Sequence, residues 1–325
     1  MNSLFAPLHR HSLFLFKPDA MKASAPSIHQ FDSISALMRY LGLPAPMHPL
    51  VVLVPSGNLR VPAEDSGDTF ILTFYKVSFK IDFKGQVKYG QGYYDFEEGG
   101  LAFIAPHQRT MAMNDPQEYE GYTFFFHPDL IRNYQLGRTI SRYGFFSYAV
   151  AEALFLSAKE KRIIDGLFAV MQEELQNNID QFSQDVMVSH IELLLNYSNR
   201  FYNRQFLTRK AKYNDLVDRM NAYLSERFDA EKSLLSGLPT VQEVADHLAV
   251  SPRFLTDMLK SLTGQNTQQH IQDRLIEKAK DILSTSDRSV AEIAYQLGFE
   301  HPQSFNRLFR RKTQVSPIAF RQSFH

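Results

Sequence analysis

The chain has 325 residues, 44% hydrophobic and 22% charged, a composition that excludes disordered and fibrous proteins and a length that allows two domains. It contains no cysteine, which excludes disulfides, thiolate zinc sites and cysteine nucleophiles and fits a reducing compartment. The formal net charge is zero, but residues 301–325 hold five basic side chains and no acidic one, which predicts a local anionic partner.

The first residues are basic and only briefly apolar. The apolar stretch Leu13–Phe16 is too short for a signal peptide, and no run in the chain approaches the ~20 residues that span a bilayer. Met21 precedes a polar stretch, so we expect residues 1–26 to be a flexible leader, with Met21 as an alternative start of translation. We expect a cytoplasmic protein without a membrane partner.

A short capped helix is predicted within residues 27–43. Asp32 or Ser33 is its N-cap, and Gly42 ends it. Its apolar face consists of Leu37, Met38 and Leu41.

Residues 50–127 follow the two-residue period of strands with one buried face. The alternating apolar positions are Val77, Phe79, Ile81 and Phe83. Further apolar runs follow at residues 87–89, 101–104 and 122–126, separated by glycines and by the turn at residues 114–116. This spacing predicts a small antiparallel barrel or sandwich.

Two amphipathic helices are predicted after the strands, over residues 161–175 and 186–201, with a turn at Asn177–Asn178 between them. Their apolar residues recur at spacings of three and four, which places them on one stripe. Such a stripe normally packs into the core of its own chain. The alternative is that the helix Val186–Phe201 pairs with its copy in a homodimer.

The C-terminal sequence contains an internal repeat. Residues 240–260 (TVQEVADHLAVSPRFLTDMLK) align with residues 289–310 (SVAEIAYQLGFEHPQSFNRLFR), and the second copy has one more residue at its central break. Thr240 with Glu243, and Ser289 with Glu292, have the spacing of a capping box, which starts a helix.

Each copy reads as a helix-turn-helix, a unit that places its second helix in the major groove of DNA. The second helices begin at Pro252 and Pro302, because proline is tolerated in a first helical turn. The units cover about residues 240–262 and 289–313, and the helical stretch Gln268–Leu283 joins them. Two such copies in one chain predict binding to double-stranded DNA.

The outward faces of the second helices supply the chemistry for this contact. Arg307 can donate two hydrogen bonds to guanine, and Gln303 can pair with adenine. We expect phosphate contacts from Lys260, Arg310, Arg311 and Lys312. The alternative for this basic cluster is a solvated helix face.

Residues 213–325 resemble the DNA-binding domain of the AraC/XylS transcription regulators. Ala291–Arg321 resembles the C-terminal signature of that family, and Thr263–Leu283 resembles its connecting helix. The resemblance implies seven helices that carry two helix-turn-helix units. It places the base contacts on Arg253, Thr256, Asp257, Gln303, Asn306 and Arg307.

Two residues depart from the pattern of that family. Gln314 stands where the family has glycine in a TG-x-SP turn, so a different local backbone is expected there. Asp257 is an acid at a base-reading position. It either accepts a hydrogen bond from cytosine or positions a neighbouring side chain.

Phe96–Gln108 (FEEGGLAFIAPHQ) resembles a glycine turn and strand of the family's cupin-like sensing domain. The predicted fold is therefore α+β. Residues 27–205 would form a cupin-like antiparallel β-barrel with flanking helices that senses an effector or pairs subunits, and residues 206–325 an all-α AraC-type domain. Several aromatic residues either line an effector cavity or fill the barrel core: Phe70, Phe74, Tyr75, Tyr93, Tyr94 and Phe103.

An enzyme is the first alternative, since cupin barrels often hold a metal between two histidines one residue apart on a strand. The predicted strands offer His107 without such a partner, and His9 and His11 lie in the leader. Glu97 and Glu98 are adjacent and face opposite sides of a strand. The sequence has no Gly-rich phosphate loop and no G-x-S-x-G elbow. We expect no catalytic residue, metal site or cofactor.

We expect a sequence-specific transcription regulator, with the choice between activation and repression left open. The expected partners are double-stranded DNA, a small-molecule effector of unknown identity, RNA polymerase and a second copy of the chain. The alternatives are an architectural DNA-binding dimer without an effector and a cupin enzyme fused to a DNA-binding domain.

Overall fold

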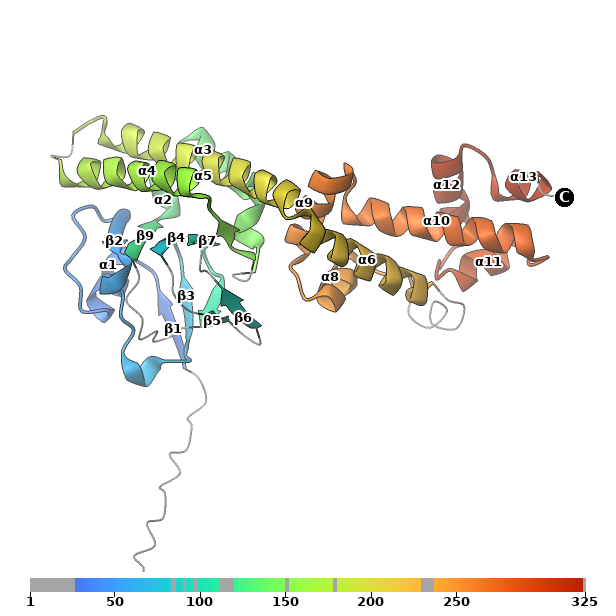
Figure 1. The fold of residues 1–325 in the computed structure, drawn as a ribbon, viewed down its shortest axis with the longest axis horizontal. Coiled ribbons are helices and arrows are strands. Elements are labelled where there is room, and N and C mark those ends of the chain that lie inside the picture. The colour runs from blue at the N-terminus through green and yellow to red at the C-terminus, as the bar shows by residue number, and fades with distance from the viewer. Residues whose placement is uncertain are drawn as a thin grey trace, which may run out of the picture.

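The computed structural model describes residues 27–82, 86–89, 92–95, 99–111, 120–149, 152–177, 180–228 and 237–323. The predicted leader, Phe83, the Glu97–Glu98 pair, the turn at residues 114–116 and Asn178 lie outside the described residues. Figure 1 shows two regions that follow one another along the long axis of the molecule. We call residues 27–208 the sheet region and residues 210–323 the helical region.

The described strands all lie in the sheet region. They are β1 (Ile28–Phe31), β2 (Val51–Pro55), β3 (Thr69–Leu72), β4 (Tyr75–Asp82), β5 (Gln86–Tyr89), β6 (Gly92–Asp95), β7 (Gly100–Ile104), β8 (Arg109–Met111), β9 (Glu120–Phe126) and β10 (Leu154–Phe155). They form three sheets with the strand orders β1-β3-β8, β10-β7-β4-β9-β2 and β5-β6. The pairs are antiparallel except β1 with β3, which is parallel.

The structure confirms an α+β fold with sheets in the first region and helices in the second. The described strands make separate sheets and do not close into one barrel. The break falls at Thr73 and Phe74, between β3 and β4, because β3 pairs with β1 and β8 whereas β4 pairs with β7 and β9.

The sheet region also contains helices and 3₁₀ turns. They are α1 (Ile34–Tyr40), η1 (Ser56–Asn58), η2 (Ala63–Asp65), α2 (Pro128–Ile131), α3 (Gln135–Thr139), η3 (Ile140–Arg142), η4 (Gly144–Ser147), α4 (Ala158–Gln176) and α5 (Ser183–Thr208). Ser33, not Asp32, is the N-cap of α1, since its hydroxyl accepts a hydrogen bond from the Ala36 N–H at 3.2 Å.

The long helices α4 and α5 cover one face of the five-stranded sheet (Figure 1). Val77 and Phe79 of β4 are fully buried, and Phe79 stacks on Phe168 of α4 with 5.6 Å between the ring centroids. On the opposite face, Phe125 of β9 packs edge to face against Phe74 at 5.8 Å. This face forms a second core with residues of β1 and β3. Alternate residues of β9 thus enter two cores, with Phe124 and Phe126 on the side of α4 and Phe125 on the other.

The apolar stripe of α5 serves mainly as core. Its buried members include Val188, Ile191, Leu194, Leu195 and Phe201. Val186 and Leu193 remain 37% and 42% exposed, on a face of α5 that this core does not cover. Pairing of this helix with a second subunit stays a prediction.

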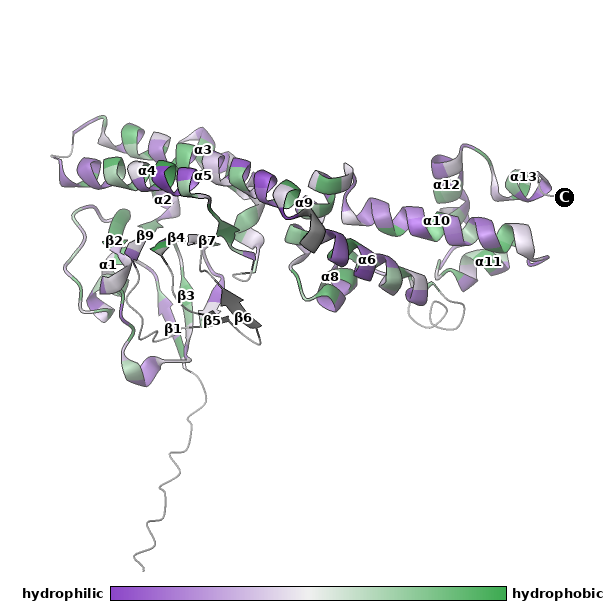
Figure 2. Ribbon diagram, viewed as in Figure 1, coloured by the Kyte–Doolittle hydropathy of each residue, from purple (hydrophilic) through white to green (hydrophobic). Residues whose placement is uncertain are grey.

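The helical region contains α6 (Lys210–Arg227), α8 (Val241–Leu248), α9 (Pro252–Thr263), α10 (Thr267–Thr285), α11 (Val290–Gln296), α12 (Pro302–Thr313) and α13 (Pro317–Gln322). In Figure 1, α10 runs between the pair α8–α9 and the pair α11–α12. Figure 2 shows hydrophilic and hydrophobic residues alternating along α10, as its position between two packed pairs requires. Within the described ranges, we find no helix with the length and apolarity needed to cross a membrane.

Candidate DNA interface

The second predicted unit consists of α11, a turn and α12. Ser289 and Glu292 form the expected capping box: the Glu292 carboxylate accepts from the Ser289 N–H at 2.7 Å, and the Ser289 hydroxyl accepts from the Glu292 N–H at 3.2 Å. Hydrogen bonds from the Ser289 N–H and hydroxyl to the carboxylate lower the pKa of Glu292. In the turn, Gly298 has φ 88°, and a side chain there would meet the backbone of Gly237 at 2.8 Å. Glycine is therefore required at this position.

Helix α12 separates a buried and an exposed face. Phe305 and Phe309 are fully buried. The predicted base-reading residues Gln303, Asn306 and Arg307 lie on the exposed face, and they form no side-chain hydrogen bond within the described part of the chain. The donors and acceptors of this face are thus available to another molecule.

The predicted phosphate contacts of α12 differ in how they are used inside the chain. Arg310 is exposed. Arg311 donates to the Gln272 side chain of α10 at 3.3 Å, and the Lys312 ammonium lies 2.5 Å from an Asp273 carboxylate oxygen. Part of the cationic charge therefore joins α12 to α10.

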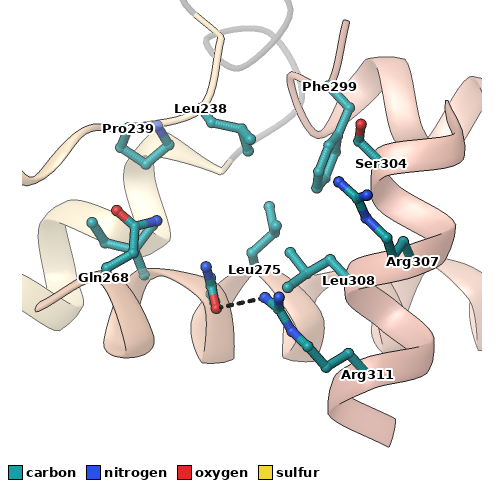
Figure 3. A pocket seen from close by; sticks show the side chains of 11 residues that line it. Leu238, Pro239, Gln268, Leu275, Phe299, Ser304, Arg307, Leu308 and Arg311 are labelled. Carbon is teal, nitrogen blue, oxygen red and sulfur yellow. Dashed lines mark hydrogen bonds between the residues drawn. The ribbon is translucent and has the colours of Figure 1, made fainter. Parts of the chain in front are cut away.

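A hollow of about 200 Å³ lies beside α12, between the two units. Figure 3 shows Arg307, Leu308 and Arg311 on one side of it and Leu238 with Pro239 on the other, above α10. The Arg307 guanidinium borders this hollow next to Phe299. Since it has no carboxylate partner among the described residues, its charge remains uncompensated by an ion pair there.

The first predicted unit consists of α8, a turn and α9. Thr240 and Glu243 form its capping box, with the Glu243 carboxylate 2.7 Å from the Thr240 N–H. Ala249 takes the left-handed conformation that Gly298 takes in the second unit, with φ 56°. Ser251 is the N-cap of α9 and accepts from the Phe254 N–H at 3.3 Å.

The predicted base-reading residues of α9 already have partners inside the chain. Arg253 Nε lies 3.0 Å from Asp257 Oδ2, and the hydroxyls of Thr256 and Thr267 lie 3.0 Å apart. Asp257 Oδ2 also accepts from the Tyr148 hydroxyl at 2.9 Å. In this structure Asp257 positions neighbouring side chains. Its contact with a base, like the other assigned DNA contacts, stays a prediction.

Two residues of the sheet region that contact α9 were not found from the sequence. Besides Tyr148, the Glu152 carboxylate accepts from the N–H of Ser251 at 2.6 Å and from its hydroxyl at 2.5 Å. Tyr148 also packs edge to face on Phe254, with 5.3 Å between ring centroids. Nothing in the local sequence signals these contacts, because about 100 residues separate the partners.

The turn after α12 corrects one expectation. Gln314 has φ 66°, and Gly264 has φ 78° at the matching place after α9. The backbone therefore keeps the left-handed turn although the residue is not glycine. The Gln314 side chain donates to the Arg311 carbonyl oxygen at 3.1 Å.

The sheet region brings together one group of side chains that could hold a metal ion, counted among the described residues. His29 Nε2 lies 2.8 Å from an Asp68 carboxylate oxygen and 3.9 Å from one of Asp65. Tyr40 donates to Asp65, and the Ser27 N–H donates to Asp68 at 2.9 Å. Hydrogen bonds between β1, α1 and the η2–β3 turn account for this cluster.

The aromatic residues predicted for the barrel are mostly core. Phe70, Phe74 and Phe103 are buried, and Tyr75 stacks on Phe126 at 4.7 Å. The side chains of Tyr93 and Tyr94 lie outside the described ones. His107 is exposed and has φ 65°.

Comparisons with known proteins agree with this geometry. A family described as "Helix-turn-helix domain" matches residues 244–323. The HTH-type transcriptional activator RhaS of Salmonella schwarzengrund (strain CVM19633) is 33% identical over 136 residues, which are 42% of this chain and 46% of RhaS. The chain thus matches less than half the length of that relative.

Two solved structures align with about a third of the chain. The C-terminal domain of the two-component response regulator yesN from Fusobacterium nucleatum is 26% identical, with 33% of this chain and 98% of that one covered and a TM-score of 0.29. The DNA-binding domain of AdpA, described as a global transcriptional factor in complex with a target DNA, is 28% identical, with 34% and 91% covered and a TM-score of 0.29.

Proposed function

We propose that the chain is a sequence-specific DNA-binding transcription regulator of the AraC/XylS family. One observation carries the proposal. Gln303, Asn306 and Arg307 stand exposed on one face of α12, with no hydrogen-bond partner among the described residues. A recognition helix needs such a face, because base edges in the major groove are read by side-chain donors and acceptors.

The repeat extends the proposed interface to a second groove segment. In this proposal α9 and α12 enter successive major grooves on one side of the duplex, and α10 sets their separation. Gln303, Asn306 and Arg307 read bases, and so do Arg253, Thr256 and Asp257. Lys260, Arg310, Arg311 and Lys312 contact phosphates.

The sheet region would control this activity. We assign residues 27–205 to a cupin-like domain that senses a small molecule or pairs subunits, and residues 206–325 to the DNA-binding domain. The exposed Val186 and Leu193 of α5 support a subunit contact, since apolar side chains on a helix face are covered in a dimer. RNA polymerase would be the second macromolecular partner, because the relative RhaS is named an activator.

Selection of binding sites from random duplexes with the full chain tests the proposal. We expect enrichment of a site with two conserved segments about one helical turn apart. Arg307→Ala should lose preference at one base pair of that site, whereas Lys159→Ala, an exposed position of α4, should leave the site unchanged. Enrichment of no sequence would contradict a sequence-specific regulator.

An architectural DNA-binding dimer without an effector is the second candidate, because the described aromatic side chains mainly fill the core. Thermal shift of the full chain against a metabolite panel separates the two, since a bound ligand stabilises the folded state by mass action. A stabilising metabolite that changes DNA affinity favours the sensor. DNA binding that no metabolite changes favours the architectural dimer.

A further inference from the structure

The N-terminal part of the outward face of α9, around Asp257, is partly covered by another part of the chain. Helix α9 lies where α5 meets the helical region (Figure 1), and the 3₁₀ turn η4 packs against it. A methyl group added at Gly144 of η4 would collide with the Asp257 carboxylate and lie 2.7 Å from Arg253 Nε. The Asp257 carboxylate faces η4 and accepts from Tyr148, so a base could reach it only after these groups move away. The Arg253 side chain is held by Asp257 but remains 47% exposed.

The first turn of α9 is occupied by an acid. The N-terminus of a helix attracts anions such as phosphate, because its first N–H groups are unpaired and the helix dipole is positive there. The Glu152 carboxylate holds this place: it accepts from the Ser251 N–H and hydroxyl and from the Ala149 N–H at 2.7 Å. A DNA phosphate that approached this end of α9 would meet a carboxylate.

The contact combines polar and apolar parts. Glu152 is 7% exposed, and burial raises its pKa, although its hydrogen bonds oppose that shift. The Tyr148 hydroxyl donates to Asp257, and the Tyr148 ring packs on Phe254. Phe254 also packs edge to face on Phe206 of α5 at 5.4 Å. Hydrogen bonds therefore lie beside an aromatic contact in the packing of α9 against the sheet region.

We propose that Tyr148 and Glu152 form an autoinhibitory latch that keeps α9 off DNA, while α12 stays free to bind. This inference rests on the proposed function and concerns how the proposed DNA interface is regulated. Full-site binding then requires release of α9 from η4. The apparent affinity for a two-segment site is reduced by the fraction of molecules with α9 bound to the sheet region.

Two conservative changes in the full chain test the latch. Tyr148→Phe removes one hydrogen bond, and Glu152→Gln replaces the carboxylate with a group that presents one acceptor to Ser251. The combined variant should bind a selected two-segment duplex roughly tenfold more tightly, and its footprint should extend over the second segment. Tyr143→Phe is the matched control, because Tyr143 donates to Asn196 of α5. An affinity within about twofold of the wild type would overturn the latch.

A reversible lock provides the opposite test. Because the chain has no cysteine, Gly144→Cys with Asp257→Cys would introduce the only thiols, at two positions in contact. The oxidised protein should bind the two-segment duplex at least about tenfold more weakly than the same protein after reduction. Equal affinities in the two redox states would contradict the proposal.

Amide hydrogen exchange separates failure of the latch from failure of the proposed function. In the absence of DNA, exchange in α9 should be faster in the Tyr148→Phe, Glu152→Gln variant and unchanged in α12. Unchanged exchange in α9 would refute the latch even if the chain binds DNA. If exchange in α9 is faster in the variant but the chain shows no sequence-specific DNA binding, the contact between α9 and the sheet region is supported. That result would refute the proposed function and, with it, the proposed inhibition.

Discussion

Helices α9 and α12 have the same length and the same place in their units, but different surroundings. Each begins with proline, buries aromatic or aliphatic residues on one face and ends in a left-handed turn. On the polar face of α9, Arg253 pairs with Asp257 of the same helix, and Thr256 with Thr267 of α10. Asp257 also accepts from Tyr148 of the sheet region. On the polar face of α12, Arg311 and Lys312 contact α10, but Gln303, Asn306 and Arg307 have no hydrogen-bond partner within the described residues. A repeated sequence therefore gives two similar helices, and the contacts made elsewhere in the fold decide how much of each polar face is left uncovered.

The largest expected difference concerns stability. Phe254 and Phe309 are both buried, but Phe254 also packs on Tyr148, Phe206 and Tyr213. Replacement of either by alanine should cost about 3–5 kcal/mol. Phe254→Ala should accelerate amide exchange in α5 and α9, whereas Phe309→Ala should affect only α10 to α13. Equal exchange patterns in the two variants would contradict the interdomain role of Phe254.

The next difference concerns base recognition. Arg307→Ala should cost about 1–3 kcal/mol on the selected site and relax preference at one base pair. Arg253→Ala should cost less in the wild-type background, because Arg253 is engaged with Asp257. Fluorescence anisotropy with the selected duplex and single-base variants measures both. A uniform loss on all sequences would place Arg307 on phosphate instead.

Salt dependence should separate the cations of α12. Arg310→Ala should weaken binding to all duplexes and lower the salt slope by about one, as expected for one lost phosphate contact. Lys312→Ala should change the slope less, since its ammonium is paired with Asp273. Titrations at several salt concentrations provide the slopes. A sequence-selective loss for Arg310→Ala would contradict its assignment.

Substitutions at the left-handed turns after α9 and α12 should change stability by smaller amounts and in opposite directions. Gly264→Ala has free space for the added methyl group, so its cost should be the conformational strain alone, about 1 kcal/mol. Gln314→Gly removes the same strain and should stabilise the chain by up to about 1 kcal/mol. The greater conformational entropy that glycine gives the unfolded chain offsets part of this gain. Urea denaturation measures both. Destabilisation by Gln314→Gly would show that its hydrogen bond to Arg311 dominates.

The smallest expected effect is a pH dependence of the helix caps. Because hydrogen bonds from Ser289 lower the pKa of Glu292 in the folded state, its stabilisation is present above the unfolded value of about 4.3 and disappears as the pH falls through the folded value. Glu292→Gln keeps an acceptor without the titration. The difference in Tm between the two proteins should be largest above about pH 5 and should vanish in stronger acid. A constant difference would contradict the role of the charge.

The local elements of the chain were predictable because their signals are local. Each of these signals spans only a few residues. Examples are the capping boxes that begin at Thr240 and Ser289, the prolines that open α9 and α12, and the alternation of β4. The three- and four-residue spacing of Phe305, Leu308 and Phe309 likewise marks the inward face of α12, where Phe305 and Phe309 are buried and Leu308 is partly buried.

The contacts that cover α9 were not predictable, for the opposite reason. Tyr148 and Asp257 are 109 residues apart, and neither residue type distinguishes an interdomain hydrogen bond from a solvent-exposed one. The strand Ile28–Phe31 was also missed, because its parallel pairing with β3 is a tertiary contact with no signature in four residues. The left-handed Gln314 shows that a residue preference can yield to the turn that surrounds it.

The length of α10 has a consequence for the DNA itself. Its 19 residues rise about 1.5 Å each, so the rod that carries both units is about 28 Å long, comparable to the pitch of B-form DNA. A rigid spacer of this kind cannot stretch. One additional base pair between the two recognition elements would displace one of them by about 3.4 Å. DNA sites bound in the proposed way should therefore tolerate base changes between the elements far better than insertions there.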